Sequence, residues 1–410
     1  MGTLDGANGV GTAVVARKGA MGREAPPEAM RVLVLTASYG SGHQSCATAL
    51  AECWERDFAG VHVDLQDYYR AFASRLLARA STFAYAQSIK RAPLLYGSFY
   101  RLTESIRWDH RLQRNLNRVG QEPLARYVAA QPADVVVSLH PGPAGACSGL
   151  RLAGRLPAAA ATVITDYAIH SQWIHPGTDL YLVGCERVAD GLLARGVEPE
   201  RIRITGIPVR RRFVNDGVLP DCRVRYGVPA DRPVFLIMPG AYGAMAGTRE
   251  VMRLLADLPV HVVTVCGHDR RLKARLEREG CPSGACTVLG WSDAVHELMG
   301  IADLIITKAG GITVTEAVTK EVPILVYRSI PGQEEQNTEY LADLGVAVHA
   351  RDHGELRTWL RRFATEPALL AEMRARARAA RRPEAACDAA RAIIELATTP
   401  VEAAARTFIH

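Results

Sequence analysis

Short apolar runs alternate with longer helical stretches along most of this chain, and that alternation limits its fold more than any other feature. Strands separated by helices form parallel sheets that are covered by helices on both faces. Six runs in the first half have the length of buried strands, at 31–36, 61–65, 134–139, 160–165, 180–183 and 203–205. Six more follow in the second half, at 234–238, 260–266, 287–289, 304–307, 324–327 and 347–350. The sequence therefore predicts an α/β protein with two doubly wound parallel sheets.

An arginine-rich, poorly periodic stretch at 208–232 separates the two sets of strands, and we expect it to be an interdomain linker. A chain of 410 residues is also too long for one typical core. We place the N-terminal domain at 30–207 and the C-terminal domain at 233–366. Residues 1–29 are rich in Gly and Ala without a hydrophobic period, which is typical of a disordered leader. Residues 367–410 begin with an Ala-, Arg- and Glu-rich stretch and form a helical tail.

Composition and charge exclude several classes of protein. A net charge of +6 suits an anionic nucleotide sugar or a negative membrane surface, but without a clustered stripe it is too weak to indicate nucleic acid. No apolar run reaches about 18 residues, and the N-terminus lacks a signal pattern, so we expect neither a membrane span nor secretion. Nine cysteines without a Cys-x-x-Cys pair predict free thiols in a reducing, cytoplasmic compartment.

The strongest local signal is the Gly-Gly turn that follows the run 304–307. Gly310 and Gly311 open a helix whose first residues include Thr313 and then Glu316. Backbone N–H groups at such a helix start can hold a phosphate, while a carboxylate about one turn deeper can reach a ribose. A tight turn without any ligand is the alternative interpretation. The layout indicates a nucleotide.

A second polar cluster follows the next strand, at 324–327. Gln333, Glu334 and Asn337 place amides and a carboxylate at the start of the following helix. Consecutive strand ends of an open parallel sheet face one crevice, where ligands bind. We therefore expect both clusters to converge on one cleft.

These clusters resemble the nucleotide-sugar site of the monogalactosyldiacylglycerol synthase and processive diacylglycerol glucosyltransferase family, which are inverting GT-B enzymes related to MurG. The resemblance rests on motifs in family order between about residues 31 and 381: Leu35–His43, Thr165–Tyr167, Trp173–His175, Thr205–Val209, Thr307–Gly311 with Thr315–Ala317, and Pro331–Glu334 with Asn337. It implies a GT-B fold, with two Rossmann-like domains facing a cleft and a tail that crosses back to the N-terminal domain. It also implies that a glucose or galactose passes from a UDP-sugar to diacylglycerol at the inner face of the cell membrane.

The resemblance assigns the donor site to the C-terminal domain. The glycine loop at 238–243 is placed at the diphosphate, and the strand ends at Gly267 and Trp291 are placed around the uracil ring. Glu316 would hold the ribose, while Gln333, Glu334 and Asn337 would hold the sugar. The full set of expected donor residues is Gly240, Gly243, Gly267, Trp291, Gly310, Gly311, Thr313, Glu316, Gln333, Glu334 and Asn337.

His43 is the first candidate for the general base, because an imidazole accepts a proton while it stays largely neutral at working pH. It follows strand 31–36 and precedes a helix expected near Gln44, and a helix N-terminus further disfavours the imidazolium. The alternative interpretation of the same loop is a dinucleotide-binding site, in which Asp64 at the end of the second strand would hold a ribose. Ser45 stands where that motif has its third glycine.

Asp166 is the second catalytic candidate, because it closes strand 160–165 at the same sheet edge. Its carboxylate would orient the base or act as the base. The alternative is a helix N-cap.

The acceptor side and the membrane contact are expected from three places in the first half. Gly42 lies in the glycine loop, and Trp173 and His175 follow strand 160–165, where an exposed indole would contact lipid. Segment 83–108 mixes aromatic and basic residues, including Tyr96 and Arg101, in a pattern typical of an interfacial patch on anionic lipids. Core packing is the alternative in both places. Pro93 and Gly97 predict an interrupted, loop-bearing element there.

The chain lacks an Asp-x-Asp motif, so we expect no metal and no cofactor besides the UDP-sugar. Helix N-termini and backbone N–H groups would instead stabilise the charge of the diphosphate. Three other functions stay open: transfer to another hydrophobic acceptor, nucleotide-sugar epimerisation on a GT-B fold, and non-catalytic sensing of a UDP-sugar.

Overall fold

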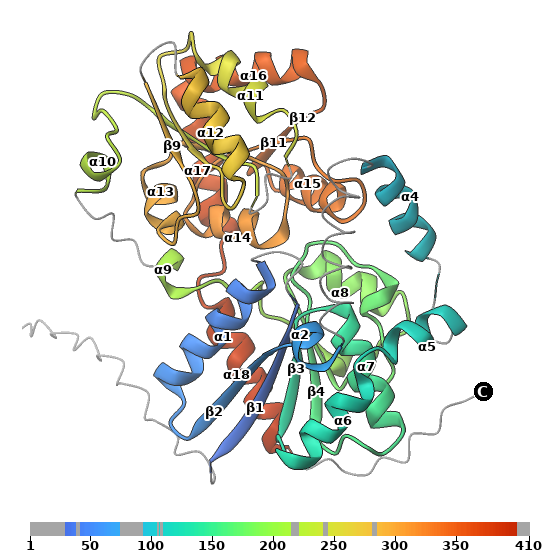
Figure 1. Ribbon diagram of the computed structural model, residues 1–410. Helices are drawn as coiled ribbons and strands as arrows, with labels where there is room; N and C mark the ends of the chain where they lie inside the picture. The colour runs from blue at the N-terminus through green and yellow to red at the C-terminus, as the bar shows by residue number, and fades with distance from the viewer. Residues whose placement is uncertain are drawn as a thin grey trace, which may run out of the picture.

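The computed structural model describes residues 29–37, 42–73, 93–104, 106, 110–214, 221–240, 245–280 and 285–399. Two six-stranded parallel sheets with helices packed around them lie one above the other (Figure 1). We call the part built on the first sheet the N-terminal half and the part built on the second sheet the C-terminal half. The predicted α/β fold class with two doubly wound units is confirmed.

The first sheet has the strand order β2-β1-β3-β4-β5-β6. The chain adds β2 on one side of β1 and the remaining strands on the other, so the topology switches direction between β1 and β3. Buried β-branched residues dominate its central strands, as in Val135, Val136 and Val137. The strands are β1 (Met30–Thr36), β2 (Val61–Asp67), β3 (Val135–Ser138), β4 (Ala159–Val163), β5 (Leu180–Val183) and β6 (Ile202–Ile204).

The second sheet has the order β12-β11-β10-β7-β8-β9, with its switch between β7 and β10. Its strands are β7 (Val234–Met238), β8 (His261–Val265), β9 (Cys286–Leu289), β10 (Leu304–Thr307), β11 (Ile324–Tyr327) and β12 (Ala347–Ala350). Each of the twelve strands matches a predicted run to within a residue or two. In an open parallel sheet the switch point is where ligands bind, at the carboxyl ends of the strands.

Helices cover both faces of each sheet. Those of the N-terminal half are α1 (Gly42–Asp57), α2 (Tyr68–Phe72), α4 (Pro93–Glu104), α5 (Arg111–Asn117), α6 (Gln121–Ala130), α7 (Pro141–Leu152) and α8 (Glu186–Leu193). Two short helices, α9 (Arg211–Val214) and α10 (Cys222–Arg225), lie in the expected linker. Those of the C-terminal half are α11 (Thr248–Leu255), α12 (Arg270–Glu279), α13 (Val295–Ile301), α14 (Gly311–Thr319), α15 (Gln333–Asp343) and α16 (His353–Thr365).

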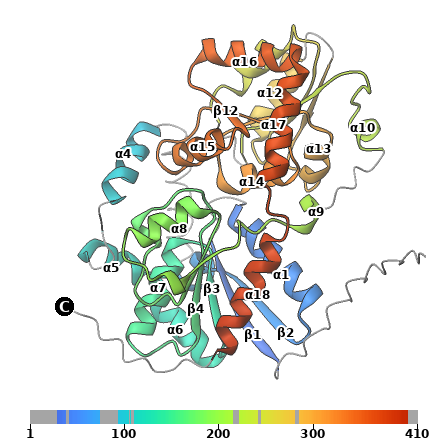
Figure 2. The same cartoon turned by 180° about the vertical axis from the view of Figure 1, so that it is seen from behind.

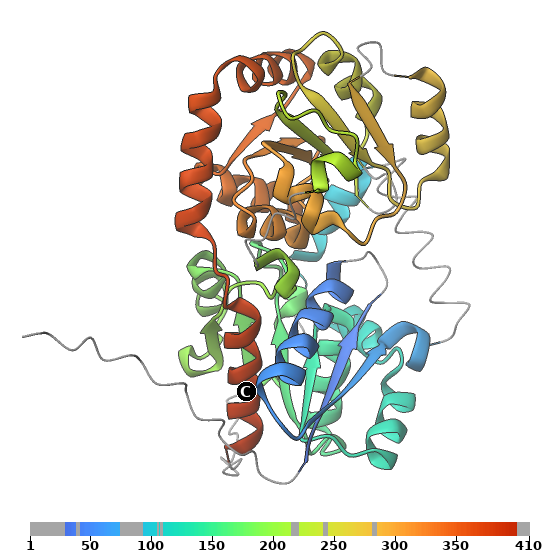
Figure 3. The ribbon, with the colours of Figure 1, turned by 90° about the vertical axis from the view of Figure 1, so that its left-hand side faces the viewer.

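The last two helices cross from one half to the other, as the view from behind shows (Figure 2). Helix α17 (Pro367–Ala380) packs on α14 and α16, whereas α18 (Ala385–Thr398) packs on α1 and on β3, β4 and β5. Figure 3 shows the two helices as one continuous path along the side of the molecule. Small buried residues on α18, such as Ala389 and Ala390, allow close approach, and the Trp54 indole of α1 donates to the Ala390 carbonyl at 3.2 Å. Burial of Ile393 adds roughly 1.5–3 kcal/mol of apolar stabilisation.

No helix among the described residues is both long and apolar enough to cross a membrane.

Candidate active site

The carboxyl ends of the central strands from both sheets face each other. Gly42 and His43 follow β1 in the N-terminal half, while Gly240 follows β7 and Gly310 follows β10 in the C-terminal half. These positions flank the switch point of each sheet. The fold therefore places the predicted base and the predicted glycine turns on facing edges of the two sheets.

His43 is the second residue of α1, which begins at Gly42 and so two residues earlier than expected. Its Nδ1 lies 3.3 Å from the Thr165 hydroxyl oxygen, and its ring packs edge-on against His140 at 5.4 Å between centroids. Burial lowers the pKa of His43 to about 4, against the opposing effect of a hydrogen bond with the backbone of Leu139. The imidazole is therefore neutral at pH 7, the state that a general base requires.

Asp166 and Asn337 join the two halves by a buried hydrogen bond. Asn337 Nδ2 donates to Asp166 Oδ1 at 2.9 Å and to the Ala309 carbonyl at 2.9 Å, and its Oδ1 accepts from the Tyr167 N–H at 2.8 Å. Burial raises the pKa of Asp166, and hydrogen bonds from Asn337 and the Gly311 backbone oppose that rise. The chain bends after β4 and no helix begins at Asp166, so the N-cap interpretation is wrong.

Gly311 lies at a point where the two halves approach closely. A Cβ atom at this position would lie 2.1 Å from the Thr165 carbonyl oxygen and 2.7 Å from Asp166 Oδ1. The neighbouring Ile312 packs in the same way on Gly42, where a Cβ would lie 3.1 Å from it. The N-terminus of α14 therefore abuts the end of β4, and only glycine fits there without moving backbone.

We expect Gly311→Ala to impede closure of the two halves. The added methyl meets a backbone oxygen that cannot rotate away, which costs about 1–2 kcal/mol and lowers turnover roughly five- to thirtyfold. Steady-state kinetics would be compared with Gly354→Ala, since Gly354 also lies near a helix start but a Cβ there meets only the Asp352 carboxylate. Equal activity of the two variants would mean that turnover does not need this contact.

Glu316 faces the N-terminal half in this conformation. Its side chain is 7% exposed, and Oε1 accepts from the Ser45 hydroxyl of α1 at 3.1 Å. Burial raises the pKa of Glu316 to about 7, while the Ser45 hydrogen bond and the charges of Arg212 and Arg210 oppose the rise. The sequence pattern gave no signal for Ser45 as a partner. The expected contact of Glu316 with a ribose stays a prediction.

Lys308 lies between two glycine turns. It forms an ion pair with Glu334, whose Oε2 also accepts from the Ile330 N–H at 2.9 Å. A Cβ at Gly240 would lie 3.1 Å from Lys308 Cε, and one at Gly310 would lie 3.3 Å from its Nζ. An ammonium beside two backbone turns can neutralise a phosphate. Sequence reasoning gave Lys308 no role, although its place between a strand end and Gly310 was a usable signal.

The remaining donor candidates occupy the same edge of the second sheet. Gly267 adopts φ +60 after β8, and Trp291 after β9 stacks on His268 at 4.2 Å with an interplanar angle of 6°. Trp291 is 46% exposed, which leaves part of its ring available to a base. Thr313 and Gln333 are half-buried in the first turns of α14 and α15. Gly243 lies outside the described residues.

Helix α4 begins at Pro93 and runs unbroken to Glu104, so the predicted interruption at Gly97 is wrong. Proline at the first helical position loses no hydrogen bond. Gly97 instead allows contact with the C-terminal half, because a Cβ there would lie 2.4 Å from Pro331. Arg101 is exposed; the side chain of Tyr96 lies outside the described residues.

The expected exposed indole at Trp173 is also wrong. Trp173 and His175 are 6% and 2% exposed, and Trp173 belongs to the main hydrophobic core. Two hydrogen bonds hold this loop against the buried Tyr181. The Tyr181 hydroxyl accepts from the His175 N–H and donates to the His175 carbonyl, each at 2.9 Å. The core-packing alternative therefore holds for this loop in this conformation.

The dinucleotide interpretation fails at Asp64. Strand β2 extends to Asp67, so Asp64 lies within the strand and not at its end. Its carboxylate accepts from the Gln66 amide at 2.7 Å and from the Tyr127 hydroxyl. Both partners belong to the N-terminal half, Gln66 on β2 and Tyr127 on α6.

Two known families match consecutive parts of the chain. The model for monogalactosyldiacylglycerol (MGDG) synthase matches residues 43–209, and the model for glycosyl transferases group 1 matches 225–380. The processive diacylglycerol beta-glucosyltransferase of Bacillus subtilis (strain 168) is 32% identical and aligns over 80% of this chain and 85% of its own length. The enzyme of the same name from Bacillus licheniformis is 31% identical, over 79% and 84%.

Solved structures agree on the architecture. MurG of Acinetobacter baumannii superposes with a TM-score of 0.59 at 17% identity, covering 89% of this chain and 99% of its own. Os79 from O. sativa, in complex with U2F and trichothecene, superposes with 0.64 at 13% identity, covering 90% and 100%. These likenesses establish the GT-B fold. With the sequence relatives, they place the chain in the monogalactosyldiacylglycerol synthase and processive diacylglycerol glucosyltransferase family, as a glycosyltransferase.

Proposed function

We propose that this enzyme transfers glucose or galactose from a UDP-sugar to the hydroxyl of diacylglycerol, with inversion at the anomeric carbon. The observation that carries the proposal is the meeting of neutral His43 and Asp166 with Gly311 and Asn337 across the two halves. Two further facts support it. The sequence relatives are named diacylglycerol beta-glucosyltransferases, and one structural neighbour of the same fold is a complex with UDP.

On the donor side, the diphosphate is assigned to the N-terminus of α14, the turn at Gly240 and the Lys308 ammonium. Backbone N–H groups and a fixed cation suit negative charge that grows as UDP leaves. The uracil is assigned to the Trp291 and His268 pair, whose rings already stack in parallel. The ribose is assigned to Glu316, and the sugar hydroxyls to Gln333, Glu334 and Asn337.

On the acceptor side, His43 accepts the proton of the diacylglycerol hydroxyl. The freed oxygen attacks the anomeric carbon while the bond from that carbon to UDP breaks, so one displacement inverts the configuration. Thr165 fixes the orientation of the imidazole through its hydroxyl. Asp166, next in the chain, stabilises the imidazolium that forms.

Substrate entry requires the two halves to separate. Asp166 and Asn337 bond to each other, and Glu316 bonds to Ser45, so both predicted sites are closed by protein groups. We infer an opening that breaks these contacts and a closure that replaces some of them with substrate hydroxyls. Such closure excludes water from the reacting atoms.

Donor, acceptor and metal independence can be tested in one assay. The protein is incubated with UDP-glucose or UDP-galactose, diacylglycerol vesicles and excess EDTA, and the lipids are analysed by mass spectrometry. We expect a hexosyl-diacylglycerol from at least one donor, at the same rate with and without EDTA. Activity that EDTA abolishes would contradict the absence of a metal. No glycolipid from either donor would contradict the acceptor, and epimerised UDP-hexose would support the rival enzyme.

We further propose that the enzyme binds peripherally to the inner face of the cell membrane through α4. The Arg101 side chain is exposed on this helix, and the neighbouring Leu102 is 67% exposed, unusually high for a leucine. A basic and an apolar side chain beside each other suit an anionic lipid surface.

Binding to anionic liposomes should weaken as salt rises, because each cation near the surface contributes about 1 kcal/mol. Arg101→Glu should lower co-sedimentation with anionic vesicles at least about fivefold. Leu152→Asp is the matched surface control, since Leu152 is 47% exposed on α7. Equal binding to neutral and anionic vesicles, or equal loss in both variants, would count against α4 as the membrane contact.

A further inference from the structure

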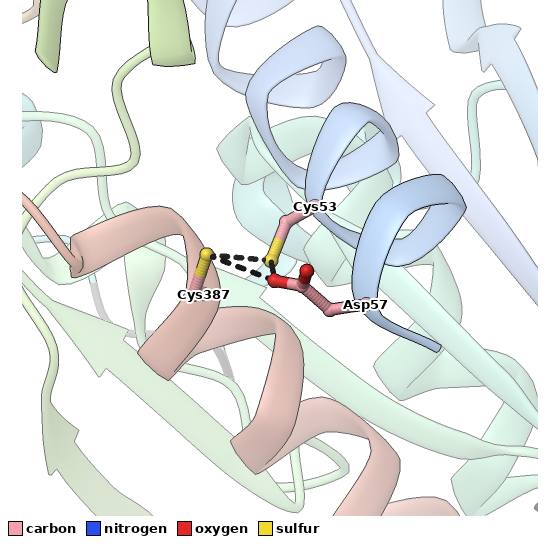
Figure 4. A group of neighbouring side chains, drawn as sticks. All are labelled: Cys53, Asp57 and Cys387. Atoms are coloured by element: carbon pink, nitrogen blue, oxygen red, sulfur yellow. Dashed lines mark hydrogen bonds between the residues drawn. The ribbon is translucent and has the colours of Figure 1, made fainter. Parts of the chain in front are cut away.

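Two cysteines from opposite ends of the chain meet where α18 packs on α1. Figure 4 shows Cys53 of α1 and Cys387 of α18 pointing toward each other, with Asp57 beside them. The Cys53 Sγ donates to the Cys387 Sγ at 2.7 Å. Cys53 is 3% exposed, whereas Cys387 is half-buried and accessible to a small reagent.

The surroundings make the two thiols unequal. Arg56 Nη2 donates to the Cys387 Sγ at 3.0 Å, and Asp57 Oδ2 lies 3.5 Å from the Cys53 Sγ and 3.7 Å from the Cys387 Sγ. The Cys53 hydrogen bond, and then the Arg56 charge, lower the pKa of Cys387 to about 7, whereas the same pairing and burial raise the pKa of Cys53. Cys387 is therefore the cysteine that ionises more readily, and Cys53 is the thiol that donates to it.

Two sulfurs and a carboxylate are also a possible zinc ligand set, and the three groups lie close enough together for one ion. A tetrahedral zinc with Zn–S bonds of about 2.3 Å would hold its two sulfurs roughly 3.7 Å apart, well beyond the observed contact. The Arg56 guanidinium also bonds to Asp57, with Nε to Oδ1 at 2.6 Å, and so places a cation against the ligands. A disulfide holds its two sulfurs about 2.05 Å apart, so forming one requires the sulfurs to move closer together, and by less than zinc would move them apart.

We propose that Cys53 and Cys387 form a reversible disulfide that fastens the crossing helix α18 to α1. The oxidant is a low-molecular-weight disulfide, RSSR. The Cys387 thiolate attacks one sulfur of RSSR, forms a mixed disulfide and releases RS⁻. Cys53 loses its proton and attacks the Cys387 sulfur, which expels the second RS⁻. The net change is two protein thiols plus RSSR giving one protein disulfide plus two RSH, and an excess of thiol reverses it.

A disulfide between Cys53 and Cys387 would fix the crossing helix α18 to the helix that carries the candidate base. Helix α1 carries His43 in its first turn, and α18 ends the segment that crosses from the C-terminal half. A link between residues 334 positions apart closes most of the chain into one loop and restricts the unfolded state strongly. The oxidised protein should therefore resist detachment of α18 and unfold at a higher temperature.

The test uses the full-length protein in glutathione buffers of increasing oxidation. We expect the oxidised form to yield a peptide pair linked through Cys53 and Cys387, to lose two titratable thiols, and to melt roughly 5–10 °C higher than the reduced form. Dithiothreitol should reverse all three changes. Cys46→Ala is the matched control, because Cys46 is a buried cysteine on the same helix, and this variant should still form the linked pair.

Two single variants separate the steps. Cys53→Ser should accumulate a glutathione adduct on Cys387, since the resolving thiol is gone, whereas Cys387→Ser should leave the buried Cys53 unmodified. Arg56→Gln should slow the first step. The proposal is overturned if the wild type keeps both thiols in excess glutathione disulfide, or if stoichiometric zinc protects Cys53 and Cys387 together. These readouts are independent of sugar transfer.

Discussion

His43→Ala is expected to lower kcat by roughly 10²–10⁴-fold, the usual contribution of a positioned general base, while UDP binding stays nearly unchanged. The variant removes the imidazole near Thr165 but leaves the C-terminal half intact. Turnover would be measured as UDP release with diacylglycerol vesicles, and UDP affinity by calorimetry. The two measurements together distinguish lost chemistry from lost binding.

His62→Ala serves as the control for this experiment, because His62 is an exposed histidine on the neighbouring strand β2. It should keep full activity. If His43→Ala also kept full activity, His43 would have no part in proton transfer and Asp166 would become the candidate base.

Glu316→Ala is expected to weaken UDP-sugar affinity by about 1.5–3 kcal/mol, or roughly 10- to 150-fold. That range applies to a hydrogen bond made by a charged group, here a carboxylate that accepts from ribose hydroxyls. Calorimetry on the folded variant measures the loss directly. Unaltered UDP affinity would show that α14 does not present this carboxylate to the nucleotide.

The pH dependence of stability gives a second test of Glu316. A buried carboxyl with its pKa raised from 4.5 to about 7 binds its proton more tightly in the folded state. Its contribution to stability is therefore full below about pH 4.5 and falls by roughly 3 kcal/mol as the pH rises to 7. Glu316→Gln cannot ionise, so its Tm relative to wild type should increase between pH 5 and pH 8. A difference that does not change with pH would contradict burial of this carboxyl against Ser45.

The strands were predictable because their signal is local. Runs such as 135–138 and 304–307 are short, apolar and rich in β-branched residues, and helical stretches flank them. The carboxyl ends of parallel strands share one edge, so Gly311 and Asn337 could be placed together from the strand order of the second sheet. The place of Asp166 on the facing half was expected only from the resemblance to GT-B enzymes.

Contacts between the halves were not predictable, because no local pattern specifies which surfaces meet. The Ser45–Glu316 hydrogen bond joins residues 271 positions apart, and Asp166–Asn337 joins residues 171 apart. Gly97 was predicted to interrupt a helix, but in the structure it packs against Pro331, where a side chain would not fit. Trp173 was predicted to be exposed, because the sequence does not show that the Tyr181 hydroxyl hydrogen-bonds to the backbone of its loop at His175.

The central claim is that one displacement, begun by a base on the N-terminal half, moves the hexose from UDP to a lipid hydroxyl. It is tested most directly by the anomeric configuration of the glycolipid made from an α-linked UDP-hexose and diacylglycerol, determined by NMR. The account predicts a β-linked product. An α-linked product would contradict single displacement and the role assigned to His43.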